Sequence, residues 1–179
     1  RRGFQVIGSR VEALTRFMGD CSRLAKLPAP RIAAVDLESC VRNTAALEKR
    51  LAVAVEGGPP VVVAADQDQL EQVLINLVKN AVEASLESDG TVGIRWTTNG
   101  TTAEVIIRDE GPGLPESVNL FVPFFTTKPE GSGIGLFLSR QIAEAHGGSL
   151  AVRNRIPGPG CKAILRLPVA DPPARPPVQ

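Results

Sequence analysis

Two asparagines lie one turn apart on the segment of the chain with the clearest helical periodicity. In "DQLEQVLINLVKNAVEAS", residues 68–85, Asn76, Asn80 and Glu83 fall in a narrow stripe opposite an apolar face. Amide oxygens stacked in this way can reach a magnesium ion and a phosphate together, and asparagine is otherwise a mediocre helix former. A solvated polar face explains these residues, taken alone, equally well. The apolar face of the segment consists of Leu70, Val73, Leu74, Leu77, Val78 and Ala81.

An aspartate followed at once by a glycine turn is the second candidate. In "RDEGPGLP", residues 108–115, Asp109 ends an apolar strand and Gly111 and Gly113 follow it. A carboxylate there can accept a hydrogen bond from an exocyclic amine, while the glycines let a flat ring approach the backbone. An ordinary strand-ending turn would use the same residues.

The third candidate is a glycine-rich segment that leads into a helix expected over residues 133–146. Gly131, Gly133 and Gly135 stand at its start, where unpaired backbone N–H groups and the helix dipole favour an anion. The pattern is not GxxxxGK[ST], and it is not GxGxxG after a strand. A Walker loop and a dinucleotide-binding turn are therefore excluded.

The histidine and cysteine content argues against a metal centre of the zinc type. The single histidine and the cysteines Cys21, Cys40 and Cys161 show no metal-ligand spacing. The scattered cysteines predict free thiols in a reducing compartment, and hence a cytoplasmic location. His146 precedes two glycines that suit the end of a helix, so we expect a helix terminus there and not a catalytic group.

The elements that would position these residues alternate between helix and strand. A heptad seam over residues 1–27 predicts a helix, which the prolines of "LPAPR" end. The pair Asn99-Gly100 between two apolar runs predicts a β-hairpin with a type I′ turn. The other expected elements are a helix over residues 35–51 with Asp36 as its N-cap, a strand at 61–65, a helix at 66–87 and strands at 149–154 and 161–167.

Charge and hydropathy exclude several classes of partner. The 20 Lys and Arg residues against 19 Asp and Glu leave a net charge of +1, which gives no electrostatic reason to expect nucleic acid or an anionic membrane. No apolar run approaches the roughly 18 residues of a membrane span, and no signal peptide opens the sequence.

The order of the motifs resembles the ATP-binding catalytic domain of sensor histidine kinases, in the superfamily of gyrase, heat-shock chaperone and mismatch-repair ATPases. The asparagine helix, Asp-x-Gly-x-Gly, "PFFTTK" and G-x-G-x-G-L follow one another as in that family, and the resemblance covers residues 36–168. The sequences "QVLINLVKNAVEA" and "PFFTTK" are most similar to those of the nitrogen-regulation branch of bacterial sensor kinases.

This resemblance implies an α/β (α+β) two-layer sandwich, in which a mixed sheet packs on three helices. Residues 31–168 would form the catalytic domain. Residues 1–30 would be the second helix of a dimerisation and phosphotransfer bundle, present in part. Residues 169–179 would be a disordered proline-rich tail.

The resemblance also implies a binding site for ATP or ADP with Mg²⁺. Asn80 would coordinate the magnesium ion, Asn76 would lie beside the triphosphate, and Asp109 would accept the adenine amino group in a pocket shaped by Gly111 and Gly113. The residues implied for a lid over the phosphates are Lys128, Gly131, Ser132, Gly133, Gly135 and Leu136.

The resemblance also has implications for the neighbours of these motifs. Phe124 and Phe125 would either pack the base of the lid or be plain core phenylalanines. Cys161, Lys162 and Ala163 stand where the family has threonines and an aromatic residue, which weakens a role for Cys161 or Lys162 in the adenine pocket.

Asn76 stands where the hydrolases of the superfamily have a glutamate that activates water. An amide cannot take a proton, so the chain is expected to hold ATP for another nucleophile, with no catalytic side chain of its own. Glu83 is not assigned as a base. The predicted function is phosphoryl donor in two-component signalling; the alternative is an anti-sigma-type regulatory module or serine kinase acting on a protein partner.

A phosphoacceptor helix with a His-Glu pair is missing from the sequence. The expected partners are therefore the histidine-bearing helix of the same kinase dimer and the receiver domain of a response regulator. A homodimer through the N-terminal helix is a further expectation.

Overall fold

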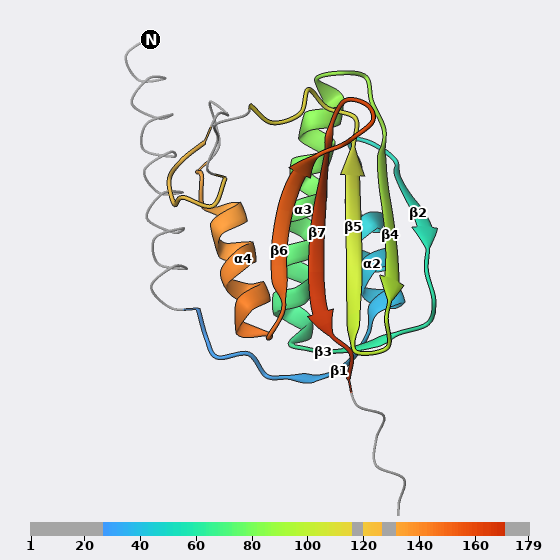
Figure 1. Cartoon of the computed structure of the whole chain (residues 1–179), viewed down its shortest axis with the longest axis vertical. Helices are drawn as coiled ribbons and strands as arrows, with labels where there is room; N and C mark the ends of the chain where they lie inside the picture. Colours follow the sequence, from blue (N-terminus) through green and yellow to red (C-terminus); the bar gives the residue numbers. More distant parts are fainter. Residues whose placement is uncertain (1–26, 116–119, 127–131, 171–179) are drawn as a thin grey trace, which may run out of the picture.

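The computed structural model describes residues 27–115, 120–126 and 132–170. Within these residues, a five-stranded sheet forms one layer and three helices form the other (Figure 1). Parallel pairing joins the first two strands in the sheet order and antiparallel pairing joins the rest, so the sheet is mixed, as the sequence predicts. The strands, in their order across the sheet, are β2 (Val53–Gly57), β4 (Val92–Thr98), β5 (Thr102–Asp109), β7 (Cys161–Pro168) and β6 (Ser149–Asn154).

The helices all lie on one face of this sheet, with α3 between α2 and α4 (Figure 1). A second, two-stranded antiparallel sheet is formed by β1 and β3. The sequence predicted the three helices and β3, whereas β1 and β2, of four and five residues, were not predicted. The bounds are α2 (Leu37–Leu47), α3 (Gln67–Leu86), α4 (Gly135–Ala145), β1 (Ala33–Asp36) and β3 (Val62–Ala65).

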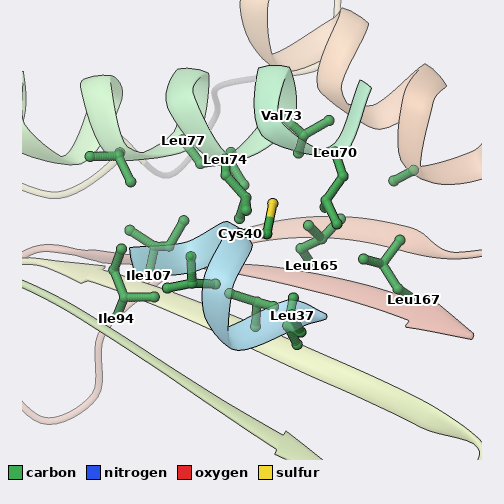
Figure 2. Close-up of a cluster of buried hydrophobic side chains, with 14 of the residues drawn as sticks. Leu37, Cys40, Leu70, Val73, Leu74, Leu77, Ile94, Ile107, Leu165 and Leu167 are labelled. Carbon is green, nitrogen blue, oxygen red and sulfur yellow. The ribbon is translucent and has the colours of Figure 1, made fainter. Parts of the chain in front are cut away.

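The apolar face of α3 forms the centre of the core. Its leucines point toward the strands, where they meet side chains such as Ile94, Ile107 and Leu165 (Figure 2). Each buried leucine contributes about 2 kcal/mol relative to an exposed one, so the rotation of α3 about its axis is strongly determined. The predicted face is confirmed in full, because Leu70, Val73, Leu74, Leu77, Val78 and Ala81 are all buried.

The helix α2 is shorter than the sequence predicts. Asp36 caps its start as expected, its carboxylate accepting from the backbone N–H of Ser39 at 3.0 Å. The helix ends at Leu47, and not near residue 51, because the Glu48 carboxylate accepts the next backbone N–H groups along the chain, at 2.9 and 2.8 Å. The Arg50 side chain, which donates to both oxygens of this carboxylate, and the two backbone N–H groups lower the pKa of Glu48 to about 2.

The turn of the β4–β5 hairpin differs from the predicted type. A type I′ turn centred on Asn99-Gly100 needs positive φ at both residues, and only Gly100 has it, at 96°. Asn99 instead uses its side-chain oxygen to accept from the backbone N–H groups of Thr101 and Thr102. The hairpin prediction is confirmed and the turn type is wrong.

The lone histidine joins two helices. His146 is 5% exposed at the C-cap of α4, and Gly147 after it has a φ of 71°, as a helix-ending glycine should. Its Nδ1–H donates to the Ile142 carbonyl at 2.7 Å, while Nε2 accepts the backbone N–H of Asp66 at 3.0 Å. Both ring nitrogens are used, so His146 holds the end of α4 against the start of α3.

The described structure extends slightly beyond the expected bounds of residues 31–168. Pro28, assigned to the N-terminal segment, accepts a hydrogen bond from the Gln69 side chain. Val169 and Ala170, assigned to the tail, donate backbone hydrogen bonds to the carbonyls of Thr101 and Val62. The helix expected at 1–27 lies outside the described residues apart from Leu27, as do residues 171–179. None of the helices in the described part has the length and apolarity of a membrane span.

Asp66, whose backbone N–H is bound by His146 at the junction of α3 and α4, offers a test of this packing. Its carboxylate caps α3 by accepting from Gln69 N–H at 3.1 Å and also accepts from Arg31 N–H at 2.8 Å. These bonds, the one from Arg31 first, lower the pKa of Asp66 below its ordinary value of 3.8. We expect Asp66→Ala to lower the free energy of unfolding by about 1–2 kcal/mol near neutral pH, measured by urea denaturation.

Because the pKa of Asp66 is lower in the folded than in the unfolded protein, its carboxylate stabilises the fold fully at pH values above the unfolded-state pKa. This stabilisation is lost as the pH falls through the folded-state pKa. The difference between wild type and Asp66→Ala should therefore be constant above about pH 5 and shrink below about pH 4. Asp68→Asn, which removes a charge from the same first turn without removing the cap, is the control. A loss as large in that variant would contradict the capping role.

Candidate functional site

The asparagines of α3 lie on its outer stripe, half-buried, as the sequence predicts. The Asn76 amide donates from Nδ2 to the buried Ser139 hydroxyl of α4 at 2.9 Å. Among the described residues, the Asn80 amide has no hydrogen-bond partner within the protein. One amide is therefore held by the fold and the other remains available to a ligand.

The glycine segment meets α3 at Asn76. A Cβ atom on Gly135 would lie 2.4 Å from Asn76 Oδ1, so the start of α4 can approach this amide only because residue 135 has no side chain. In the sequence, the asparagine helix and the glycine segment are separate motifs, and nothing in it indicates that they touch. Their contact places the N-terminal end of α4 beside the outer stripe of α3.

Asp109 is 7% exposed at the end of β5. Its Oδ1 accepts from the backbone N–H groups of Gly111 and Cys161, both at 3.0 Å. Both hydrogen bonds found for the carboxylate use the same oxygen, so Oδ1 is committed to the fold and the orientation of the group is set. The carboxylate is thus preorganised to accept a further donor on Oδ2.

Residues 109–114, here called the aspartate loop, pack against the C-terminal half of α3. A Cβ on Gly111 would lie 2.9 Å from the backbone of Ala84. Asn76, where Gly135 touches the helix, and Ala84 are eight residues apart, which is two turns and a further rotation of about 80°. Asn80 lies midway, about 6 Å along the axis from each contact. The start of α4 and the aspartate loop therefore contact α3 on either side of Asn80 along its axis.

The end of β6 supports the aspartate loop, and the sequence did not indicate it. Asn154 exchanges hydrogen bonds with both backbone groups of Leu114, and Arg155 donates to the Asp109 carbonyl at 2.9 Å. No motif marks these two residues or Ser139, because only sheet pairing and helix packing bring them to the site. Gly113, with φ of 84°, lies against the Asn154 side chain.

Cys161 contributes to the site through its backbone. Its N–H holds Asp109, while its thiol lies 3.5 Å from the Asn154 side-chain oxygen. Burial, and secondarily the charge of Asp109, raise the pKa of the Cys161 thiol to about 11, so the group stays neutral. A chemical role for this thiol is not supported.

The glycine segment rests on the phenylalanines before it. Phe124 and Phe125 are 47% and 46% exposed, so the alternative that they are core residues is wrong. Phe124 N–H donates to the Gly133 carbonyl at 3.1 Å, and Gly133 has a φ of 69°. Ser132 is exposed and Leu136 packs partly against the core. Lys128, the predicted phosphate contact, and Gly131, a predicted anchor of the lid, lie outside the described residues.

Oxygen ligands for a hard cation are sparse on this face. In the part of the chain that the structure describes, no group of three or more His, Cys, Asp or Glu side chains could hold a metal ion. A magnesium ion at Asn80 would thus take most of its ligands from phosphate oxygens and water. That is the usual way in which Mg²⁺ binds beside a nucleotide, so the residues present fit the ion.

Comparison with known proteins identifies relatives of the chain. A family profile described as "Histidine kinase-, DNA gyrase B-, and HSP90-like ATPase" matches residues 65–171. The C4-dicarboxylate transport sensor protein DctS of Rhodobacter capsulatus is 33% identical over 182 residues, which cover 94% of this chain and 27% of DctS. The chain therefore spans about a quarter of the length of that relative.

Two solved structures resemble the fold. Full-length ShkA in complex with AMPPNP matches 95% of this chain and 39% of its own, with 26% identity and a TM-score of 0.77. Histidine kinase ThkA in complex with the response regulator protein TrrA matches 95% of this chain and 51% of its own, with 27% identity and a TM-score of 0.76.

The close approach of the β6–β7 loop to Asp109 can be tested with two glycines of that loop. Gly160 and Gly158 both have positive φ, at 91° and 106°, but a Cβ on Gly160 would lie 2.1 Å from the Asp109 carbonyl, whereas one on Gly158 would meet nothing within 4 Å. Gly158→Ala should cost about 1 kcal/mol of backbone strain, and Gly160→Ala about 1–3 kcal/mol more. Urea denaturation measures both, and equal losses would contradict the packing described here.

Proposed function

The chain belongs to the histidine kinase-, DNA gyrase B- and HSP90-like ATPase family, with sensor histidine kinases as its relatives, and we propose that it binds Mg–ATP and serves as the phosphoryl donor of such a kinase. One observation carries the proposal. The start of α4 contacts α3 at Asn76, and the loop of Asp109, whose carboxylate is oriented by two backbone N–H groups, contacts it at Ala84, with Asn80 between the two along the helix. A base, a metal-bound phosphate and a further phosphate need these groups in this order.

The base would be recognised at the aspartate loop. Asp109 Oδ1 is occupied by Gly111 and Cys161, so Oδ2 would accept from the 6-amino group of adenine. Gly111 and Gly113 would keep the wall of the pocket thin enough for the ring.

The phosphates would lie between α3 and the start of α4. Asn80 would be the protein ligand of Mg²⁺, which supplies neutralisation of the phosphate charge. The N-terminal end of α4, with Gly133 and Gly135, would face the terminal phosphate through backbone N–H groups. Lys128, Gly131, Ser132 and Leu136 remain predicted contacts of the lid.

Transfer rather than hydrolysis is favoured by Asn76. Its amide has no proton-accepting function and is held by the Ser139 hydroxyl, so it would position the triphosphate without activating water. Positioning and charge neutralisation supply most of the catalysis in phosphoryl transfer, and neither requires a base on this chain.

The phosphoryl acceptor would be a histidine on another helical segment of the kinase dimer, followed by the receiver domain of a response regulator. The response-regulator complex of the related ThkA supports such a partner. Both ring nitrogens of His146 are engaged in the fold, so this histidine is unsuited to accept phosphate. Dimerisation through the N-terminal helix and membership of the nitrogen-regulation branch remain predictions.

We also propose a cytoplasmic location, where ATP and a receiver domain are both present. Cys40 and Cys161 are buried free thiols, as suits a reducing compartment. Burial raises the pKa of the Cys40 thiol to about 12, which leaves it a neutral core residue.

Calorimetry with ADP and Mg²⁺ tests nucleotide binding directly. Asp109→Asn can keep the bonds from Gly111 and Cys161 on its oxygen, but its Nδ2 then faces the adenine amine, donor against donor. We expect ADP affinity to fall about 10- to 100-fold, the value of a hydrogen bond to a charged group.

Asp89→Asn is the matched control, since Asp89 is exposed and asparagine tolerates its positive φ of 51°. Its affinity should equal that of wild type. Undetectable binding of Mg–ADP by the folded wild-type chain would refute the proposed function.

Incubation with γ-labelled ATP tests the excluded role of His146. Because the ring is buried and both nitrogens are hydrogen-bonded, the chain alone should acquire no acid-labile phosphate. His146→Gln gives the background of the assay. Label present in wild type and absent from that variant would contradict the expectation.

A further inference from the structure

The aspartate loop is held at both ends by consecutive residues of the β6 terminus. Asn154 contacts the last residue of the loop and Arg155 contacts the first. We propose that Asn154 and Arg155 are positioning residues that set the selectivity of the site for a 6-amino purine. This inference rests on the proposed function.

Asn154 acts as a bidentate partner of Leu114. Its Oδ1 accepts the Leu114 N–H at 2.7 Å, and its Nδ2 donates to the Leu114 carbonyl at 2.9 Å. The side-chain amide thus makes the same two hydrogen bonds with Leu114 that a paired strand residue would make through its backbone. These bonds attach the end of the loop to the sheet. A Cβ on Gly113 would lie 3.1 Å from the same Oδ1, which shows how closely the loop follows the side chain.

Arg155 holds the other end of the loop. Its guanidinium donates to the Asp109 carbonyl at 2.9 Å and lies 3.6 Å from the Glu110 carboxylate. Glu110 in turn accepts from the backbone and side chain of Thr91, at 3.0 and 2.8 Å. The arginine side chain is 25% exposed, so most of its surface packs against the protein.

Arg155 holds the backbone of Asp109, and Asn154 holds Leu114 at the other end of the loop. The backbone N–H groups of Gly111 and Cys161 fix the orientation of the Asp109 carboxylate. The Oδ2 atom that would read the amino group therefore depends on β6 for its position, although neither Asn154 nor Arg155 need touch the nucleotide. Loosening the loop should reduce discrimination between bases more than it reduces affinity for the phosphates. A misplacement of the order of 1 Å is enough for such an effect.

The ratio of the dissociation constants of ADP and inosine diphosphate isolates this effect. Inosine diphosphate differs at the position of the 6-amino group and carries the same phosphates, so a change in the folded or active fraction cancels in the ratio. With Mg²⁺ present, wild type should prefer ADP by about 10- to 100-fold. Asn154→Ala should reduce this preference by about threefold or more, since it removes two hydrogen bonds from the loop.

Arg155→Met, which keeps much of the stem and removes the donor and the charge, should also reduce the preference. Arg155→Lys should restore part of it, because one ammonium group can still donate to the Asp109 carbonyl. Arg153→Ala, at the neighbouring exposed position on β6, should leave the ratio at the wild-type value.

The outcomes separate this inference from the proposed function. A wild-type chain that binds no ADP would remove the proposed function and the inference with it. A wild-type chain that binds ADP and inosine diphosphate equally would overturn the inference, since no base contact would exist to be positioned. A preference for ADP that survives unchanged in Asn154→Ala and in Arg155→Met would overturn the inference alone.

Discussion

The burial of one face of α3 is the constraint on which the rest of the structure depends. The leucines and valines of this face pack on the sheet, and α2 and α4 pack on its two sides. Because a helix repeats every 3.6 residues, burying that face turns Asn76 and Asn80 outward without further contacts. Their placement is therefore a consequence of core packing, and the start of α4 and the aspartate loop contact α3 on either side of Asn80.

Backbone groups, more than side chains, complete the site around that stripe. Asp109 is oriented by the N–H groups of Gly111 and Cys161, and Gly135 and Gly111 allow two loops to lie directly on α3. Fixed backbone dipoles need no reorganisation when a charged ligand binds, which is the usual basis of preorganised electrostatic sites. Cys161 illustrates the point, since its thiol is inert and its amide is the part that matters.

His146 and Asn76 show how residue type limits function. The histidine is used at both ring nitrogens to join α4 to the start of α3, and this explains its presence without any chemistry. The Asn76 amide donates to the Ser139 hydroxyl, so it can position a ligand, whereas a carboxylate at this place could act as a base. Both observations favour a domain that presents a phosphoryl group to an acceptor elsewhere.

The sequence by itself determined the elements whose signals are local. Hydrophobic periodicity identified α3 and its buried face, the Asp36 cap identified the start of α2, and the order of the Asn, Asp and Gly motifs identified the family. Local signals failed where a side chain competed with the backbone, as at Glu48 and at the Asn99 turn. The support of Asp109 by Asn154 and Arg155, and of Asn76 by Ser139, was decided only by the tertiary structure. These partners lie tens of residues apart in the chain and meet through sheet pairing and helix packing, which no local pattern of residue types records.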